Sequence, residues 1–261
     1  MVKSLFNNIP TVNQISIAWY LSRSETLARY RNTVLGPLWM VLGSGIGIVG
    51  LVVVWGKLLP SGNDKFVISV GYGLILWQSI TFILTDCCSI LVRNTVTMTS
   101  IKYPPLFYTV QVVFKAFINY IHALLLLPLL VYFTPGPMDS DLLYCLLGTV
   151  LFFANLSWIG HLLAIFALRF RDVEQIVSTI IPLLFFLTPV LFRKNAFESE
   201  SILLLLNMNP FTLFIEIARS PLIGDEIALS HYLIAFAMAI AGWLTTLLIE
   251  KKVGSKLVFW I

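Results

Sequence analysis

The sequence predicts an all-α integral membrane protein with six transmembrane helices and both termini in the cytoplasm. Only 11% of its 261 residues are charged and 58% are hydrophobic, and the mean hydropathy is +0.90. Soluble domains carry about 25% charged residues. The apolar residues also gather in runs of the length that a helix needs to cross a bilayer, about 20 residues. We therefore expect residues 1–261 to form a single transmembrane domain.

The first segment, residues 1–33, predicts an amphipathic helix on the membrane surface. Arg29, Arg31 and other charged residues alternate there with apolar ones, and Trp19 suits the bilayer interface. A plain solvated tail is the alternative. Gly36-Pro37 then mark the turn into the first apolar run. No apolar leader segment follows the N-terminus, so we expect the spans themselves to direct insertion.

Six apolar runs are long enough to cross a membrane. The expected spans are residues 34–59, 66–92, 105–133, 142–168, 174–192 and 228–250. In the first run, Gly43 and Gly47 have the small-residue spacing of close helix contacts. In the fifth run, Pro182 and Pro189 are expected to kink the helix, because each removes a backbone hydrogen bond.

The stretch 201–222 is not expected to span. Asn209 and Pro210 interrupt its apolar residues, and Pro221 follows a second short run, so neither half is long enough. Broken helix at membrane depth survives only inside protein or beside a cavity. We expect a re-entrant helix pair between the fifth and sixth spans.

The distribution of basic residues predicts the orientation. With six spans and the N-terminus inside, most Lys and Arg residues fall in internal segments, and the external segments collect Asp and Glu. This is the bias of the positive-inside rule. A seventh span at 201–222 would place Lys251 and Lys252 outside, which the same rule disfavours.

Several chemistries find no support in the residues. The nearest approach to a phosphate-binding loop, Gly50 to Lys57, has the wrong spacing and lies in an apolar run. We therefore expect no nucleotide site, no cofactor and no metal in this chain. The three cysteines lie in apolar runs, which predicts buried thiols. An enzyme acting on lipid-linked sugars would need a convergent acidic or histidine cluster, which the pattern does not offer.

Three ionisable residues lie inside expected spans: Asp86, Lys115 and His122. Intramembrane charges are candidate functional groups, and Asp86 and Lys115 are placed to pair between the second and third spans. One interpretation is a proton relay or polar lining. The other is a lysine with a local counter-ion and a hydrogen-bonded histidine. His161 stands isolated in the sequence.

Four motifs occur in order along the chain. They are Arg29–Trp39, Ile101–Leu106, Arg169–Asp172, and Asn209–Thr212 with Arg219–Leu222. Together they resemble the membrane permease subunit of type-two ABC exporters for cell-surface polysaccharides, which move O-antigen, capsule or teichoic acid polymers. The chain looks most like an O-antigen permease.

The resemblance implies a homodimer bound to two copies of a separate ATPase subunit, where ATP and Mg would reside. It implies a lipid-linked polysaccharide substrate and a location in a bacterial inner membrane, with no enzyme activity in this chain. The alternative is a proton-coupled secondary transporter that uses Asp86, Lys115 and His122.

The resemblance also implies roles for particular residues. Segment 94–103 would be a coupling helix that inserts into the ATPase. The expected ATPase-coupling residues are Arg29, Arg31, Ile101, Lys102, Tyr103, Pro104, Pro105, Arg169, Arg171 and Asp172. The expected channel-lining residues are Trp39, Tyr72, Trp77, Phe82, Phe185 and Phe186, although aromatic residues near span ends also form interfacial belts. The expected periplasmic gate is formed by Asn209, Pro210, Phe211, Arg219 and Pro221.

Overall fold

The computed structural model describes residues 9–36, 38–58, 65–100, 103–134, 141–193 and 200–257, which form helices and contain no strand. The helices are α2 (Val12–Tyr30), α3 (Leu38–Leu58), α4 (Phe66–Arg93), α5 (Thr95–Ser100), α6 (Pro105–Ala123), α7 (Leu127–Tyr132), α8 (Leu142–Arg169), α9 (Asp172–Leu187), α10 (Glu200–Met208), α11 (Pro210–Arg219) and α12 (Leu229–Leu257). Two 3-10 turns complete them, η1 (Leu124–Leu126) and η3 (Ser220–Ile223). The all-α prediction is confirmed for this part of the chain.

Within the described residues, four segments have the length and hydropathy needed to cross a membrane. They are Phe66–Arg93, Pro105–Tyr132, Leu142–Arg169 and Leu229–Val253. These four coincide with the expected second, third, fourth and sixth spans. Such segments are the ones that hydropathy predicts best, because each is a long apolar run with few charges.

The expected first and fifth spans correspond to α3 and α9, which are not among these four segments. Helix α9 has 16 residues and is therefore only about 24 Å long. It ends at Leu187, where Thr188 adopts an extended backbone. The expectation of two prolines inside one helix is thus wrong for Pro189, which follows the end of α9, while Pro182 lies within it.

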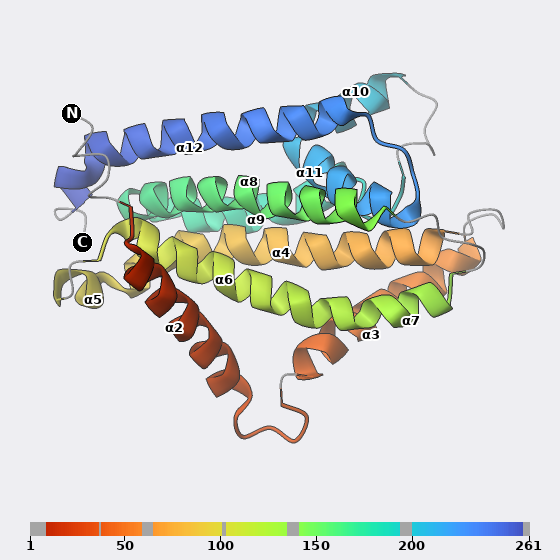
Figure 1. Ribbon diagram of the computed structural model, residues 1–261, viewed down its shortest axis with the longest axis horizontal. Coiled ribbons are helices and arrows are strands. Elements are labelled where there is room, and N and C mark those ends of the chain that lie inside the picture. The colour runs from red at the N-terminus through yellow and green to blue at the C-terminus, as the bar shows by residue number, and fades with distance from the viewer. Residues whose placement is uncertain are drawn as a thin grey trace.

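Helix α4 forms the centre of the bundle, between α8 and α6 (Figure 1). Most of its residues are buried, since the sequence is apolar around the whole circumference of the helix. Small residues allow neighbouring helices to approach closely. The clearest case is Gly148 on α8, which lies against the backbone of Ile217 on α11. The three cysteines are buried free thiols, as expected.

The long helices run from one end of the bundle to the other (Figure 1). One end holds α5, the α8–α9 turn at Arg169–Asp172 and the C-terminal part of α12; we call it the α5 end. The opposite end holds α10, the start of α4 and the segment that leads into α12; we call it the α10 end.

Helix α2 begins at a capping box, in which the Thr11 hydroxyl accepts from the Gln14 amide and the Gln14 side chain accepts from the Thr11 amide. Its buried face consists of the small residues Ala18, Ser22 and Thr26. The Ser22 hydroxyl lies 3.0 Å from a backbone carbonyl of α6. Trp19 and Leu21 pack beside this face, with the Trp19 ring 5.3 Å from that of Phe114 on α6, whereas Val12, Tyr20 and Leu27 are exposed. The predicted helix is confirmed, and Figure 1 shows it inclined to the bundle axis.

The chain turns at Gly36, between α2 and α3, as the sequence predicts. Gly36 has a φ of 54°, a conformation that residues with a Cβ rarely adopt.

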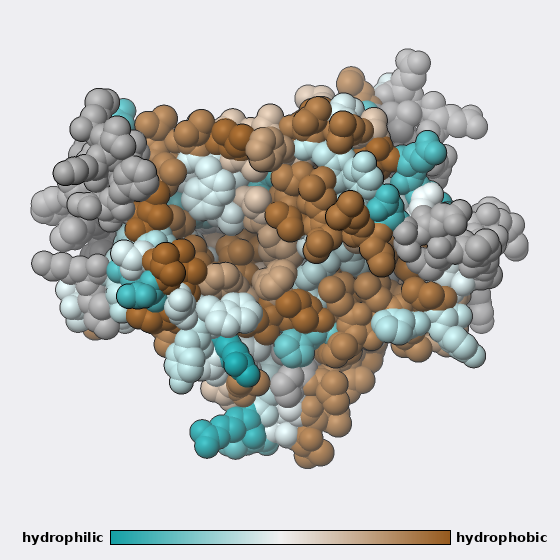
Figure 2. All heavy atoms as spheres, in the orientation of Figure 1, coloured by the Kyte–Doolittle hydropathy of each residue, from teal (hydrophilic) through white to brown (hydrophobic). Residues whose placement is uncertain are grey.

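Hydrophobic side chains cover much of the visible face, and hydrophilic ones gather over the tip formed by α2 and the link between α2 and α3 (Figure 2).

The predicted break in the region 201–222 is present. Helices α10 and α11 are separate, and Asn209 stands between them with its Oδ1 accepting from the Phe211 amide at 3.0 Å. Asparagine as N-cap followed by Pro210 at the first helical position is a favourable start for a new helix. This local chemistry explains why the apolar run does not continue as one helix.

Candidate functional site

A stripe of polar and aromatic side chains runs along the junction of α4 and α6. We define the polar stripe as Gln78, Phe82, Asp86 and Arg93 on α4 with Lys115 and Asn119 on α6. Within each helix these residues recur at four- or seven-residue spacing, which places them on one side. Two hollows lie along the stripe, and both contain residues of α4 and α6.

The first hollow lies midway along the bundle and has a volume of about 200 Å³. Phe82, Gln78 and Asn119 line it together with small and apolar residues. It therefore offers two aromatic rings, those of Phe82 and Tyr120, two amide side chains, and the hydroxyls of Ser79 and Tyr120.

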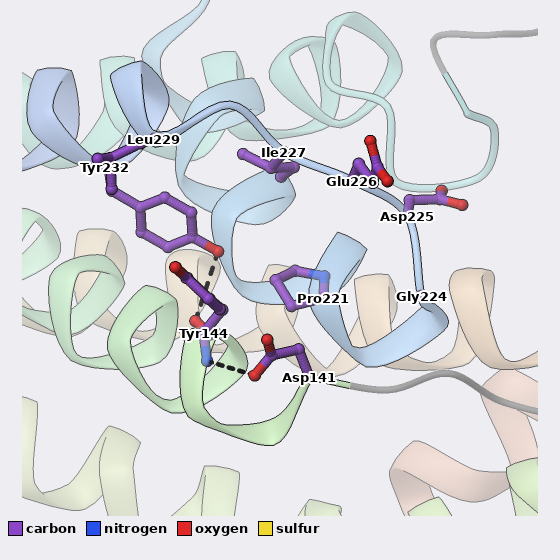
Figure 3. Close-up of a pocket in the computed structure, with 9 residues that line it drawn as sticks. All are labelled: Asp141, Tyr144, Pro221, Gly224, Asp225, Glu226, Ile227, Leu229 and Tyr232. Carbon is purple, nitrogen blue, oxygen red and sulfur yellow. Dashed lines mark hydrogen bonds between the residues drawn. The ribbon is translucent and has the colours of Figure 1, made fainter.

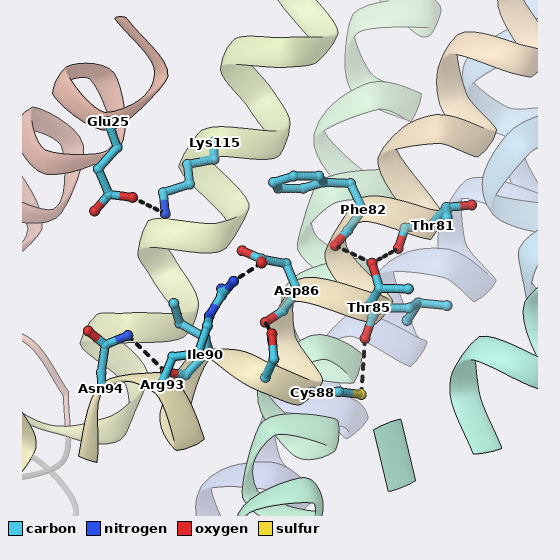
Figure 4. Close-up of polar contacts among 12 residues, drawn as sticks. Glu25, Thr81, Phe82, Thr85, Asp86, Cys88, Ile90, Arg93, Asn94 and Lys115 are labelled. Atoms are coloured by element: carbon cyan, nitrogen blue, oxygen red, sulfur yellow. Dashed lines mark hydrogen bonds and ion pairs between the residues drawn. The ribbon is translucent and has the colours of Figure 1, made fainter. Parts of the chain in front are cut away.

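The second hollow, the polar pocket, has a volume of about 230 Å³ and lies toward the α5 end. It is lined by Glu25, Arg29, Asp86, Ile90, Arg93, Asn94, Gln111 and Lys115. Helices α2, α4 and α6 each contribute charged residues. Figure 4 shows Glu25 of α2 and Lys115 of α6 pointing toward each other, and Asp86 and Arg93 of α4 doing the same.

Two ion pairs organise the polar pocket. Arg93 Nη2 lies 2.6 Å from Asp86 Oδ1 on the same helix, and Lys115 pairs with Glu25 across the α2–α6 contact. The expected pairing of Asp86 with Lys115 is therefore wrong, because each of them has a different partner (Figure 4). Lys115 with a local counter-ion agrees with the second of the two interpretations that the sequence left open.

His122 bonds to its own helix. Its Nδ1 lies 2.7 Å from the Ile118 carbonyl, so this nitrogen carries the proton and donates it. Asp86, Lys115 and His122 thus have three separate partners, and the described structure does not join them into a relay.

We expect His122→Gln to leave the transport rate within about twofold of that of the wild type, because the hydrogen bond that His122 makes lies within its own helix and such substitutions change stability by about 0.5 kcal/mol or less. The measurement is the transport rate in reconstituted vesicles. The matched change Lys115→Gln removes a paired cation and serves as the comparison. Loss of transport in the His122 variant, with the protein still folded, would revive the proton-relay interpretation.

His161 is not isolated, contrary to the expectation from the sequence. It is fully buried in α8, with Nδ1 3.0 Å from Thr109 Oγ1 on α6. Its Nε2 lies 3.3 Å from a carboxylate oxygen of Glu250 on α12, which is also fully buried. A buried carboxylate is costly without a partner, so this contact ties α12 to the core near the α5 end.

The α5 end collects most of the expected ATPase-coupling residues. Helix α5 has no buried residue. Pro104 and Pro105 form the cap and first residue of α6, and the Tyr103 ring lies 4.3 Å from that of Phe107. At the neighbouring turn, Arg169 ends α8, Asp172 begins α9 and Arg171 lies between them. Ile101 and Lys102 lie outside the described residues.

Arg29 and Arg31 occupy different surroundings. Arg29 lines the polar pocket beside Arg93 and Asn94, which directly precede α5. Arg31 is exposed at the end of α2 that lies away from α5 in Figure 1. The expected coupling residues that the structure describes therefore do not form one cluster.

Some of the expected channel-lining aromatic residues are exposed or line a hollow, and others are buried. Trp39 and Phe186 are exposed, by 48% and 70%, and Phe82 lines the first hollow. Trp77 is buried against Phe185, with ring centroids 5.4 Å apart.

Tyr72 is a core residue in this conformation. Only 1% of its surface is exposed, and its hydroxyl lies 2.7 Å from that of Tyr120 and 3.4 Å from Thr149 Oγ1. A side chain this deeply buried cannot touch a substrate, so the expected lining role of Tyr72 is wrong for this conformation. Its polar end is satisfied inside the subunit.

The α10 end holds a cleft of about 500 Å³ (Figure 3). It is lined by Asp141, Tyr144, Pro221, Gly224, Asp225, Glu226, Ile227, Leu229 and Tyr232. Asp141 caps α8 through its Oδ1, and the Tyr232 hydroxyl lies 3.1 Å from the Ile217 carbonyl. Of the expected gate residues, Pro221 lines this cleft directly.

Two other expected gate residues hold the chain after α9 in place. Arg219 is 2% exposed, and its Nη1 donates to the carbonyl of Pro189 at 2.7 Å. Burial lowers the pKa of Arg219 to about 10, so it stays a cation at neutral pH. Asn209 Nδ2 donates to Thr188 Oγ1 at 2.8 Å. Phe211 is buried beside Asn209 and Pro210 at the start of α11.

Comparison with known proteins identifies the family. Residues 17–223 match the family model described as "ABC-2 type transporter". The chain belongs to this family. The permease is also 26% identical over 192 residues to the "O-antigen export system permease protein RfbA" of Myxococcus xanthus, covering 73% of this chain and 74% of the relative. The resemblance drawn from the four motifs is confirmed, and ABC-2 family membership implies a partner ATPase subunit.

The family match covers a defined part of the permease. It begins within α2 and ends at η3, so it includes the polar stripe, α5, the α8–α9 turn and the α10–α11 break. Helix α12 lies outside the match, and with it Glu250 and part of the cleft at the α10 end.

Proposed function

We propose that the chain is the channel-forming permease subunit of an ATP-driven exporter that moves lipid-linked polysaccharide, of the O-antigen kind, from the cytoplasm across a bacterial inner membrane. The observation that carries the proposal is the ABC-2 family match, together with the O-antigen export permease among its relatives. ATP and Mg would bind to a separate ATPase subunit.

The charge distribution supports a cytoplasmic α5 end. Arg93, Arg169, Arg171 and Lys252 lie there among the described residues, while Asp141 and Glu226 lie at the opposite end. Basic residues favour the cytoplasmic side. In this arrangement α3, with 21 residues, and α9 complete the six spans, and α10 with α11 forms the re-entrant pair on the periplasmic side.

The surface of α3 supports a homodimer. Trp39, Ile46 and Val49 are exposed on this helix, and no neighbouring atom of the described residues lies within 4 Å of a Cβ built on Gly43 or Gly47. Side chains fill the interior of a single subunit, so a hydrated sugar chain needs a wider path between two copies. The polar stripe, with amide, charged and aromatic side chains, would then supply contacts for sugars along that path.

The experiment is purification of the permease from its own organism in mild detergent, followed by identification of bound proteins and a measurement of ATP-dependent polymer export in vesicles. We expect a stoichiometric ATPase subunit, and export that stops when its nucleotide-binding lysine is replaced. A stable permease that exports polymer without any ATPase would overturn the proposal.

The structure gives less support to proton-coupled secondary transport. That mechanism needs ionisable groups that exchange protons along a path, whereas Asp86, Lys115 and His122 are each held by a different local partner. The ABC-2 family match points to ATP as the energy source instead.

A further inference from the structure

The polar pocket carries more positive than negative charge. Arg29, Arg93 and Lys115 line it against the two carboxylates of Glu25 and Asp86, which leaves an excess of one positive charge (three minus two). Arg93 and Lys115 are held in ion pairs. Within the described part of the chain, Arg29 has no carboxylate within ion-pair distance. The pocket therefore presents a cation whose charge is not balanced locally.

The burial of the paired groups shows which of them a ligand can displace from its ion pair. The side chains of Lys115 and Asp86 are 12% and 18% exposed, whereas those of Glu25 and Arg93 are 53–54% exposed. Each pair thus joins one enclosed group to one group at the rim. An anion entering from the rim can take the place of the Glu25 carboxylate beside Lys115 while Arg29 and Arg93 close around it.

The position of the pocket indicates what kind of anion it would meet. It lies between residues of α2, α4 and α6, next to Arg93 and Asn94, which directly precede α5 (Figure 4). Ile90 is an apolar residue of its lining, and Asp86 and Lys115 belong to helices that are long and apolar enough to cross a membrane. Basic pockets between membrane helices at the cytoplasmic side bind the head groups of anionic lipids. A group with an apolar tail fits this site better than a soluble anion.

We propose that the polar pocket binds the phosphate group of a lipid. A phosphate oxygen anion accepts charge-assisted hydrogen bonds from arginine and lysine, and once Glu25 is displaced the pocket holds three cations against the Asp86 carboxylate, an excess of two (three minus one) that a phosphate or diphosphate offsets. Two lipids carry this chemistry: an anionic phospholipid of the surrounding membrane and the diphosphate-linked lipid that carries a polymer. The second source rests on the proposed function, and the first does not.

The test uses the purified full-length permease in a neutral detergent, without any ATPase. Farnesyl diphosphate is the probe, farnesol is the phosphate-free control, and binding is titrated by native mass spectrometry. We expect farnesyl diphosphate to bind and farnesol not to bind. Arg29→Gln and Lys115→Gln should each weaken the binding about tenfold, because each removes a charge-assisted hydrogen bond.

Two further variants keep the test independent of folding defects. Glu25→Gln removes the competing carboxylate and should tighten binding several-fold. Arg31→Gln removes an exposed arginine two residues beyond Arg29 that does not line the pocket, and it should leave binding unchanged. Equal weakening by Arg29→Gln and Arg31→Gln, or no tightening by Glu25→Gln, would overturn the proposal.

A competition experiment separates the two sources. Dioleoyl phosphatidylglycerol is added to the complex with farnesyl diphosphate, and the bound ligand is identified. Displacement at equimolar phospholipid assigns the pocket to a membrane lipid, and retention of the diphosphate assigns it to the lipid-linked substrate. Both results support a lipid-phosphate site. Because no ATPase or polymer is present, failure of this binding test is distinguishable from failure of the proposed export function.

Discussion

Gly148→Ala is expected to destabilise the subunit strongly, although it adds only one methyl group. A Cβ at this position would lie 2.0 Å from the carbonyl oxygen of Ile217 and 2.9 Å from the Cα of Ala218. Both neighbours are backbone atoms of α11, so no side chain can rotate away. Overpacking of this kind costs about 1–3 kcal/mol and occasionally more. Thermal unfolding of the purified protein in detergent measures the loss.

The effect should extend beyond the contact itself. Cys145 donates to the Ala218 carbonyl at 3.3 Å, and the Tyr232 hydroxyl lies 3.1 Å from the Ile217 carbonyl. Separating α8 from α11 therefore strains the contacts that join α8, α11 and α12. We expect the cleft of Figure 3 to change shape, since Tyr144 and Tyr232 line it from α8 and α12.

Gly43→Ala is the matched control. It adds the same methyl group to a glycine in another apolar helix, where no neighbouring atom of the described residues lies within 4 Å of the new Cβ. Alanine is the better helix former by roughly 0.5–1 kcal/mol, so the subunit should keep its stability or gain slightly. If both variants lost stability to the same extent, the close approach of α8 and α11 would be refuted as the cause.

The long apolar helices and the helix break could be predicted from the sequence because both depend on local information. Four candidate spans follow from runs of uncharged residues, and the start of α11 follows from Asn209 and Pro210. The Asp86–Arg93 ion pair could also be predicted from the sequence, since residues seven apart lie on the same side of a helix. The end of α9 at Leu187 was less predictable, because apolar residues continue past it.

The pairings between helices could not be predicted, since they depend on which faces meet. Glu25 finds Lys115 only because the small residues Ser22 and Thr26 let α2 lie against α6. Glu250 reaches His161 only because α12 packs on α8. Aromatic residues were ambiguous for the same reason. Tyr72 near a span end suits a membrane belt, a channel wall or a core, and the hydroxyls of Tyr120 and Thr149 decide for the core.

Val96→Asp is expected to abolish ATPase-dependent export while the subunit stays folded. Val96 is 76% exposed on α5, and α5 has no buried residue. A polar substitution at such a position changes the stability of the isolated subunit by less than about 0.5 kcal/mol. If α5 inserts into the ATPase, the same change places an unpaired charge in an interface. An uncompensated buried charge costs about 3–5 kcal/mol, so the ATPase recovered with the permease should fall at least tenfold.

Val34→Asp supplies the control for this prediction. Val34 is fully exposed, on the link between α2 and α3, and that link lies away from α5 in Figure 1. It introduces the same charge at an exposed valine that is not among the expected ATPase-coupling residues. Copurified ATPase, ATP hydrolysis and polymer export should all be measured for both variants, with thermal unfolding as the check on folding. If Val96→Asp retained the ATPase and exported polymer at the wild-type rate, α5 would not be the coupling helix. The Arg169–Asp172 turn, another exposed segment at the same end of the bundle, would then be the expected contact with the ATPase.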